Sequence, residues 1–559
     1  MTSIRFAFAF FLLVAASAAQ VADEGADLVI IGRVITLDPT LPEAGAIVVR
    51  GGHIERLTSA ESAGSRITPR TRVIRLAGDS VVIPGFIESH GHLRSLGKLA
   101  RTINLADATS AEDIRIAVSK AAKDLPKGAW ILGRGWNHER FTQKEWPTLK
   151  CLEEFTENPI ALSRTDGHAL LANRRALELA NISRASPNPT GGEVMKDPSG
   201  EPTGILIDRA MEPVSALAES DPSPQLIIGD YVAAEKSCLA EGVTSFIDAG
   251  TTPGELMRLA TMIDEGRFQV RVHALLYAST PADLAAATAR PPIHDLANGR
   301  LSVRGLKISA DGALGSRGAA LTEPYSDRPS STGLLITPPP FLVDAARRAL
   351  ANGWQLCVHS IGDRANRVVL DAMEAALREN PVKDHRFRIE HAQIVDPTDL
   401  PRFAQLGVIA SIQPCHATSD GPWAPKRIGA ARYASMGYPA RSLLDAGARI
   451  CFGTDVPVEP ISPIRNLVAA ITRCDPDGVL GGPFRAEERL NRKEALLGAT
   501  AWGAYASFAE NRRGTLSPGM DADLVILSAN PLTAEPSSLA KARVLTTIVA
   551  GRIVYEAAR

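Results

Sequence analysis

Apolar runs recur through the middle of the chain, and most are separated by stretches with helical periodicity. Seven of them lie at residues 242–250, 269–277, 303–312, 355–363, 386–394, 407–415 and 448–456. An eighth, VVIPGFIESHGH, precedes them at residues 81–92. Strands that alternate with helices form right-handed parallel crossovers, so eight such units predict an α/β fold, a closed (β/α)₈ TIM-type barrel over residues 85–504. A doubly wound open sheet is the alternative.

The two ends of the chain have a different pattern. Residues 23–84 and 505–559 consist of short β-rich runs separated by turn residues, without helical periodicity. Chain termini often lie close together, so these two pieces are expected to pair into one small β-sandwich. About 150 residues separate the first barrel strand from the second, far more than one helix needs. An inserted subdomain is therefore expected over residues 100–230.

Residues 1–22 have the pattern of a secretory signal peptide. A short positively charged start is followed by the apolar run FAFAFFLLVAA and by small residues suited to cleavage. Export predicts a periplasmic or secreted protein, and an uncleaved membrane anchor is the alternative. No later segment has eighteen uninterrupted apolar residues, so no stable membrane insertion is expected after cleavage.

Composition narrows the classes of partner. The 61 Lys and Arg residues balance 62 Asp and Glu residues, so no overall field favours nucleic acid. The six cysteines are too few and too scattered for a disulfide framework, and several lie in apolar runs typical of buried thiols. A small-molecule substrate is the expected partner, and a homo-oligomer is left open.

Ligand-type side chains mark the ends of the predicted barrel strands. His90 and His92 lie two apart, which places them on one face of a strand, where two imidazoles suit a divalent metal. His-x-His alone is a weak signal. Four later strands carry such a residue near their carboxyl ends, namely Lys307, His359, His391 and Asp455. An unpartnered buried polar group costs several kcal/mol, and one metal centre would satisfy them all.

Several motifs together carry a family resemblance. PGFIESHGH, LKISADGALGSR, VHSIGDRA, RIEHAQ, GTDVP and GTLSPGMDADLVIL resemble the metal-dependent amidohydrolase superfamily. DGALGSR, RTDGHALLAN and GGEVMKDPSGEPTGIL are similar to its amidohydrolase 3 branch, which includes N-substituted formamide deformylases and YtcJ-like hydrolases. The resemblance covers nearly all of the chain after residue 22, and it says almost nothing about the substrate.

The resemblance implies a ligand set for one or two divalent ions. His90 and His92 match the first-strand ligands, His359 and His391 the fifth- and sixth-strand ligands, Lys307 a fourth-strand lysine, and Asp455 the eighth-strand acid. Zinc is the expected metal for imidazole and carboxylate ligands. Lys307 would have to be carboxylated or deprotonated to bind a dication.

Two positions depart from the family pattern. Glu88 stands two residues before the first histidine, where the superfamily usually has aspartate, and Gly318 follows DGALGSR, where threonine is common. Glu88 is expected to leave the ligands intact. Gly318 changes the pocket lining and weakens any transfer of substrate preference.

The expected chemistry is hydrolysis of the C–N bond of an amide or N-substituted formamide. A bound divalent metal lowers the pKa of its water from about 15.7 to about 7. Asp455 is the expected general base, which accepts the water proton and passes it to the leaving nitrogen. A non-hydrolytic metal-dependent isomerase, or an inactive binding protein on the same barrel, is the alternative.

Other residues are candidates for contact with the substrate. His168 in RTDGHA is a candidate catalytic donor to the oxyanion, and the alternative for it and its neighbour Asp166 is a hydrogen-bonded loop pair. The candidate substrate-binding residues are Trp136, Asp166, Arg317, Gln413 and His416. For Trp136, ordinary packing is an equal alternative.

Overall fold

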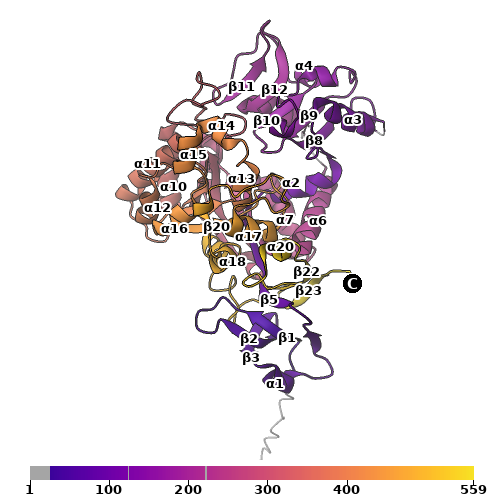
Figure 1. Cartoon of the computed structure of the whole chain (residues 1–559), viewed down its shortest axis with the longest axis vertical. Helices are drawn as coiled ribbons and strands as arrows, with labels where there is room; N and C mark the ends of the chain where they lie inside the picture. Colours follow the sequence, from indigo (N-terminus) through magenta and orange to yellow (C-terminus); the bar gives the residue numbers. More distant parts are fainter. Residues whose placement is uncertain (1–24, 124, 219, 221–222, 559) are drawn as a thin grey trace, which may run out of the picture.

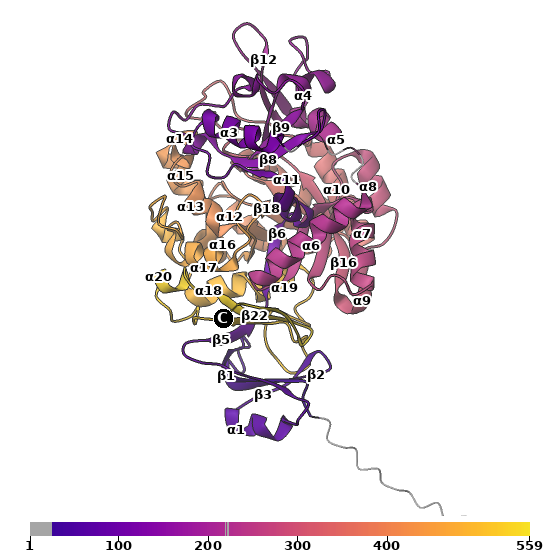
Figure 2. The ribbon, with the colours of Figure 1, turned by 90° about the vertical axis from the view of Figure 1, so that its right-hand side faces the viewer.

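The computed structural model describes residues 25–558 apart from residues 124, 219 and 221–222, and it contains three sheets. Figures 1 and 2 show them stacked along the long axis of the molecule. A central barrel lies between a sheet built from the two ends of the chain and a sheet built from the segment after the first barrel strand.

The barrel has the predicted eight parallel strands, and each predicted run overlaps one of them. They are β6 (Phe86–Gly91), β13 (Val243–Thr251), β14 (Arg271–Tyr277), β16 (Leu301–Ser309), β17 (Gln355–Ser360), β18 (Arg388–His391), β19 (Ile409–Ile412) and β20 (Arg449–Phe452). They pair in that order, with β15 (Ile293–Asp295) added at the edge of β16. Just beyond β20, Asp455 N donates to His90 O at 2.7 Å and His92 N to Val456 O at 2.8 Å. These bonds bring the last strand back to the first and confirm the TIM-type barrel.

Helices surround the barrel because each has one apolar face. In α11 (Asp363–Glu379), for example, Ala365, Val369, Met373 and Ala376 recur at helical spacing and are all buried. The other helices of this layer are α2 (Leu93–Lys98), α6 (Pro224–Ala240), α7 (Pro253–Asp264), α8 (Pro281–Thr288), α9 (Leu296–Gly299), α10 (Pro339–Asn352), α12 (Leu400–Leu406), α16 (Ala440–Asp445), α17 (Pro463–Thr472), α18 (Arg492–Gly498) and α19 (Ala501–Ala506). Helices α13 (Pro414–Ser419), α14 (Ala424–Ile428) and α15 (Ala430–Met436) follow β19.

The segment after β6 forms a sheet over the barrel. Its strands are β7 (Ile103–Asn104), β8 (Ile131–Trp136), β9 (Ile160–Arg164), β10 (Ala169–Ala172), β11 (Gly192–Lys196) and β12 (Pro202–Asp208), with helices α3 (Ala111–Ala122), α4 (Arg174–Leu179) and α5 (Glu212–Ala218). The sheet has an apolar cluster on each face, as a separately packed unit requires. Helix α6, which lies partly within the expected insertion, packs against α2 of the barrel layer.

Strands from the two ends of the chain meet in one unit, as the sequence predicts for its small sandwich. They are β1 (Leu28–Ile35), β2 (Glu43–Arg50), β3 (His53–Thr58), β4 (Arg72–Arg75), β5 (Val81–Pro84), β21 (Leu524–Leu527), β22 (Val544–Val549) and β23 (Arg552–Glu556), accompanied by α1 (Ala60–Ala63) and α20 (Pro536–Leu539). Strand β5 pairs with β21, so one hydrogen-bonded path of seven strands joins both ends, and β4 pairs with β1 beside it. Side chains of both ends share one core cluster, which includes Leu28, Ile47, Leu524 and Ile548.

The signal peptide, membrane insertion and the cysteines are the subjects of the remaining predictions from the sequence. The expected signal peptide, residues 1–22, lies outside the described residues. Among the described residues, no helix has both the length and the apolar character needed to cross a membrane. All six cysteines are free thiols, and four of them are buried.

Candidate metal centre

His90, His92 and Asp455 meet at the carboxyl-terminal end of the barrel. His90 is the second-last residue of β6, and His92 is the N-cap residue of α2. Their Nε2 atoms lie 3.5 Å and 3.3 Å from Asp455 Oδ1, which approaches from the loop after β20. The ligand atoms of these three side chains lie within 4.8 Å of one another, a spacing that one metal ion could bridge.

A second group shares Asp455. His391 and His416 place one ring nitrogen each within 4.8 Å of each other and of Asp455. His416 is thus a candidate ligand, although the sequence suggests only substrate contact. His359 packs beside His391, with ring centroids 4.5 Å apart, and His391 packs beside His90 at 4.8 Å. The chain therefore brings the predicted histidines of β6, β17 and β18 into one cluster.

Lys307 lies close enough to the histidines of the cluster for its charge to add to the effect of burial, which acts to lower their pKa values. It lies in β16 opposite Cys357 of β17 and is 4% exposed. Burial lowers the pKa of its ammonium group, while the charges of Glu390 and Asp455 oppose that shift. An easily deprotonated buried amine is the form in which lysine can bind a cation or react with carbon dioxide.

Burial favours neutral imidazoles in three histidines of the cluster, whereas at His90 burial acts to lower the pKa but Glu390 and Asp455 outweigh it, so that this pKa is raised. Burial drives the pKa values of His359 and His391 well below the ordinary range, and it also lowers that of His92. Burial acts to raise the pKa of Asp455, but the nearby imidazoles of His90 and His92 outweigh it, and the pKa lies well below the ordinary value. Neutral imidazole and ionised carboxylate are the protonation states that bind metal.

A buried ion pair that the sequence reasoning missed orients His90. Glu390 accepts from His90 Nδ1 at 2.5 Å, which leaves Nε2 facing Asp455. Arg388 holds that carboxylate through bonds of 2.7 Å and 2.8 Å and also donates to Ser89 O at 2.7 Å. The sequence does contain a signal for this pair: Arg388 and Glu390 lie two apart in the sixth predicted strand, and residues two apart on a strand share a face. A carboxylate behind a histidine fixes its ring orientation and tautomer.

Two other polar residues near the histidines have structural roles. Glu88 accepts from His90 N at 3.0 Å and from Thr454 N and Oγ1 at 2.8 Å each, so it ties β6 to the chain beyond β20. Asp311 accepts from the backbone nitrogens of Ala320, Ile361 and Gly362. Burial raises the pKa of each carboxyl group to about 7. Glu88 thus leaves the candidate ligands intact, as expected from the sequence.

His168 reaches the cluster from the inserted sheet. Its ring centroid lies 5.0 Å from that of His359, and its Nδ1 lies 2.6 Å from Asp208 Oδ1. Asp208, which sequence reasoning missed, ends β12 much as the metal-type residues end barrel strands. A Cβ at Gly318 would lie 2.5 Å from Asp208 Oδ2, so glycine at this unusual position makes room for the carboxylate. Asp166 accepts from His168 N at 3.2 Å and also pairs with Arg164, so the two loop residues are hydrogen-bonded to each other.

An open cavity of about 690 Å³ lies over the histidines and is lined by both the barrel and the inserted sheet. Its lining includes Asp166, His168, His359, His391, His416 and Asp455. Three of the candidate substrate-binding residues lie elsewhere. Trp136 is fully buried in the insertion core, where its Nε1 donates to Leu162 O, Arg317 pairs with Asp327, and Gln413 bonds His391 Nδ1 at 2.8 Å. Gln413 is thereby suited to orient His391.

The residues of the cluster fit a divalent metal. Four buried atoms of these side chains have no hydrogen-bond partner among the described residues: His90 Nε2, His359 Nε2, His416 Nε2 and Asp455 Oδ1. Buried polar atoms are otherwise nearly always satisfied, so the arrangement lacks a cationic partner. Imidazole nitrogens together with one carboxylate oxygen are a donor set typical of zinc and neighbouring metals.

A parallel barrel with such a cluster at its mouth defines the class of metal-dependent barrel hydrolases. Comparison with known proteins gives the particular family. The profile of the amidohydrolase family matches residues 74–555, so the chain belongs to the amidohydrolase family. It is a metal-dependent hydrolase of that superfamily.

Three relatives match over nearly the whole chain. The protein LONG AFTER FAR-RED 3 of Arabidopsis thaliana is 34% identical over 95% of this chain and 92% of its own length. The putative amidohydrolase YtcJ of Bacillus subtilis is 33% identical, with coverages of 91% and 94%. The N-substituted formamide deformylase of Arthrobacter pascens is 28% identical, with coverages of 95% and 98%. These matches confirm the branch that the sequence motifs suggest.

A solved structure supports the fold assignment. The uncharacterized metal-dependent hydrolase from Pyrococcus horikoshii superposes with a TM-score of 0.73 at 28% identity, covering 91% of this chain and 99% of its own. The inserted sheet and the end sheet thus belong to an architecture that has been seen before.

Proposed function

We propose that this protein hydrolyses the C–N bond of an amide or N-substituted formamide, with a divalent metal held at the barrel mouth. The observation that carries the proposal is the convergence of two pairs of histidines on Asp455 under an open cavity, His90 with His92 and His391 with His416. The similarity to an N-substituted formamide deformylase supports the substrate class.

The metal would be held by His90, His92, His359, His391 and Asp455, with Lys307 as a further ligand if it is carboxylated. We propose zinc, as one or two ions, because imidazole and carboxylate are its usual ligands. A cation bound there supplies an acidified water and polarises the carbonyl oxygen of the substrate.

Asp455 is the proposed general base. Burial acts to raise its pKa, but the nearby imidazoles of His90 and His92 outweigh burial, and the pKa lies well below the ordinary value, so the carboxylate is ionised at neutral pH. It lines the cavity, and its Oδ1 has no hydrogen-bond donor among the described residues. Oδ1 can therefore accept the proton of the attacking water and then deliver it to the leaving nitrogen, which departs as a neutral amine.

His168 is the proposed donor to the carbonyl oxygen as negative charge develops there. Asp208 holds Nδ1, so Nε2 is the nitrogen that remains for the substrate. Burial acts to lower the pKa of His168, but the bond to Asp208 outweighs it and the pKa is raised. An imidazole that keeps its proton suits donation to an oxyanion.

The experiment is metal analysis of the purified mature protein joined to a screen of formamides, N-acyl amines and lactams. We expect bound metal, loss of turnover after chelation, and recovery when zinc is restored. Mass spectrometry of the products separates the alternatives, because a hydrolase adds one water and an isomerase adds none. A protein that takes up no metal, and that gains no activity from metal addition, would contradict the proposal.

We also propose that residues 1–22 are a cleaved signal peptide and that the enzyme is periplasmic or secreted. The support is the sequence pattern of a charged start, an apolar run and small residues. Amino-terminal sequencing of the exported protein should begin shortly after residue 18 or 22. A full-length chain in the cytoplasm would contradict this.

A further inference from the structure

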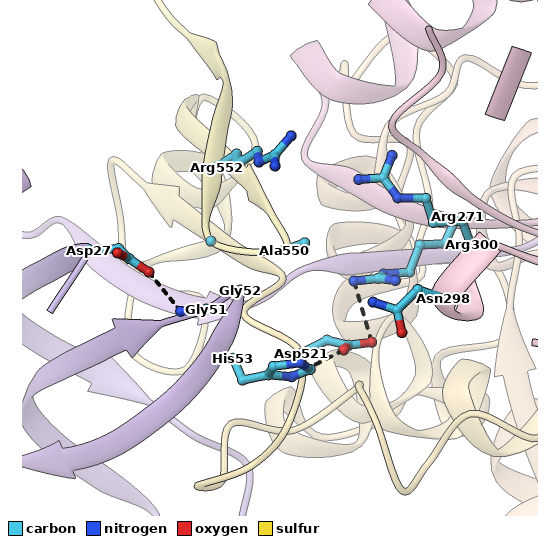
Figure 3. A pocket seen from close by; sticks show the side chains of 11 residues that line it. Asp27, Gly51, Gly52, His53, Arg271, Asn298, Arg300, Asp521, Ala550 and Arg552 are labelled. Carbon is cyan, nitrogen blue, oxygen red and sulfur yellow. Dashed lines mark hydrogen bonds and ion pairs between the residues drawn. The ribbon is translucent and has the colours of Figure 1, made fainter. Parts of the chain in front are cut away.

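A second cavity lies at the other end of the barrel, where the barrel meets the end sheet. Its volume is about 370 Å³. Figure 3 shows side chains reaching it from both units. Arg271 is the first residue of β14, and Arg300 directly precedes β16. Both therefore lie at the amino-terminal ends of barrel strands, opposite the candidate metal centre.

Two tight turns of the end sheet form the facing wall. One joins β2 to β3 through Gly51 and Gly52, and the other joins β22 to β23 through Ala550 and Gly551. All four residues have positive φ, the conformation of two-residue hairpin turns. A Cβ at Gly52 would lie 3.1 Å from Ala550 O, so glycine lets the two turns pack together. Arg552, just after the second turn, also lines the cavity.

Arg271 is fully used by carboxylates. Its Nε and Nη2 donate to the two oxygens of Asp523 at 2.6 Å and 3.0 Å, and Nη2 also lies 3.3 Å from Asp521. Asp521 is further contacted by Arg512 at 3.2 Å and Arg513 at 3.4 Å. Asp521, which lines the cavity, is therefore paired with arginines, and His53 of the lining also lies 3.5 Å from it.

Arg300 and Arg552 are different. Among the described residues, no carboxylate oxygen lies within the 4.0 Å of an ion pair from either guanidinium group. Arg300 Nη1 donates only to neutral oxygens, Phe268 O at 3.3 Å and Gln269 Oε1 at 3.1 Å. Arg552 is exposed to solvent on the opposite wall. Asp27, on the rim, accepts from Gly51 N at 2.6 Å instead.

We propose that this cavity binds a small phosphate-bearing anion, held between Arg300 of the barrel and Arg552 of the end sheet. Guanidinium groups bind phosphate oxygens in pairs, and two of them on facing walls match a dianion. The volume exceeds that of inorganic phosphate and leaves room for the organic part of a phosphomonoester. Neither the hydrolase assignment nor the family comparison gives this end of the barrel a role.

Such a ligand would connect two units of the fold. Arg300 is anchored to the barrel and Arg552 to the end sheet, so a bound dianion would hold β16 and β23 together. A ligand that binds only the folded state raises its stability by mass action. Because the candidate metal centre is at the opposite end, the expected effect is on stability and leaves turnover unchanged.

The test uses the mature, metal-loaded protein. Calorimetric titration and thermal unfolding are followed with inorganic phosphate and with glycerol phosphate, with ionic strength held constant by sodium chloride. We expect saturable binding and a rise in Tm, with glycerol phosphate tighter than inorganic phosphate. Arg300→Gln and Arg552→Gln should each weaken binding roughly tenfold, and the double variant at least about a hundredfold.

Two controls make the outcome decisive. Arg348→Gln changes an exposed arginine of α10 and should leave binding intact. Arg552→Lys keeps the charge and should recover part of the affinity lost in Arg552→Gln. Phosphate could also bind at the metal centre, but that binding would persist in the double variant. Equal affinities in the wild type and the double variant would overturn the proposal and mark an adventitious ion only.

Discussion

The two ends of the barrel both hold buried ionisable groups, yet they differ in how those groups are satisfied. At the amino-terminal end of the barrel, Asp523 accepts two hydrogen bonds from Arg271 and a third from Ala550 N at 2.8 Å. At the mouth, His359 Nε2 and Asp455 Oδ1 have no hydrogen-bond partner among the described residues. Burial alone therefore does not separate a structural cluster from a chemical one. The two kinds of cluster differ in whether their buried polar atoms have hydrogen-bond partners.

The difference has an energetic meaning. A satisfied buried ion pair resists loss of either partner, because the remaining charge is stranded in a low-dielectric interior. An unsatisfied cluster has already incurred that cost in the absence of its ligand, so removal of one member costs little stability and destroys the binding site. Substitutions at the two ends should accordingly affect different measurements.

The largest expected effect is at the mouth. Asp455→Asn should lower kcat/KM by about a thousandfold, because the base that accepts the water proton is lost. The free energy of unfolding of the metal-free protein should fall as well, but by less than the roughly 3 kcal/mol expected for a buried arginine–carboxylate pair. The groups that lower the pKa of Asp455 are two imidazoles at 3.5 Å and 3.3 Å, which hold the carboxylate less strongly than a bidentate guanidinium would. Steady-state kinetics and urea unfolding check the two statements.

The matched control is Asp344→Asn, a half-exposed acid of α10 that pairs with Arg348. It should leave both kinetics and stability within error. Unchanged turnover in Asp455→Asn would show that water is activated through another residue.

The next largest effect is on stability and lies at the amino-terminal end of the barrel. Asp523→Asn removes the closer of the two carboxylates that pair with the buried Arg271 and should reduce the free energy of unfolding by about 3 kcal/mol. Metal content and kcat should be unchanged in the folded fraction. A loss of metal without a loss of stability would break the distinction between the two ends.

Much of this architecture can be predicted from the sequence, because the signals are local. Each of the eight apolar runs overlaps a barrel strand, and the ligand-type residues at five strand ends converge because parallel strands end at one rim. Interactions that depend on distant register cannot be read in this way. Glu390 is 300 residues from His90, and Asp208 is 40 from His168.

The candidate substrate residues show the same limit. Trp136 stands in a glycine-rich stretch that reads as a loop, but it ends β8 and packs against Trp146 inside the insertion core, with ring centroids 6.0 Å apart. Arg317 belongs to a recognisable motif, yet its partner Asp327 turns it away from the mouth cavity. A residue's motif fixes its neighbourhood, while its side-chain direction depends on contacts that appear only in three dimensions.

A smaller effect tests whether the buried Arg388–Glu390 ion pair also supports metal binding at the candidate metal centre. Glu390→Gln should weaken metal binding tenfold to a hundredfold, because His90 loses the carboxylate that orients its ring. Glu390 is a positioning residue, so the readout is the metal dissociation constant measured by competition with a chelator.

Glu390→Gln also leaves the buried Arg388 charge without its carboxylate, which lowers stability by itself. A second variant separates this effect from the effect on metal binding. Glu390→Gln combined with Arg388→Met should recover stability without recovering metal affinity. Recovery of both would mean that Glu390 acts only by neutralising Arg388.

The smallest effect is a pH dependence carried by a neutral buried histidine inside the barrel. His273 of β14 lies 3.2 Å from Gln355 Oε1, and burial, with help from the Arg388 charge, lowers its pKa to about 3. In the unfolded chain the ordinary pKa is about 6.5. As pH falls from about 6.5 towards 3, the unfolded state takes up a proton that the folded state refuses, so stability falls. Between pH 7 and 5.5 this costs about 1 kcal/mol, and His273→Gln should remove that part of the pH dependence. Urea unfolding of metal-free protein at both pH values measures it, because metal binding has its own pH dependence. If the variant loses as much stability as the wild type over this range, His273 is not the group responsible.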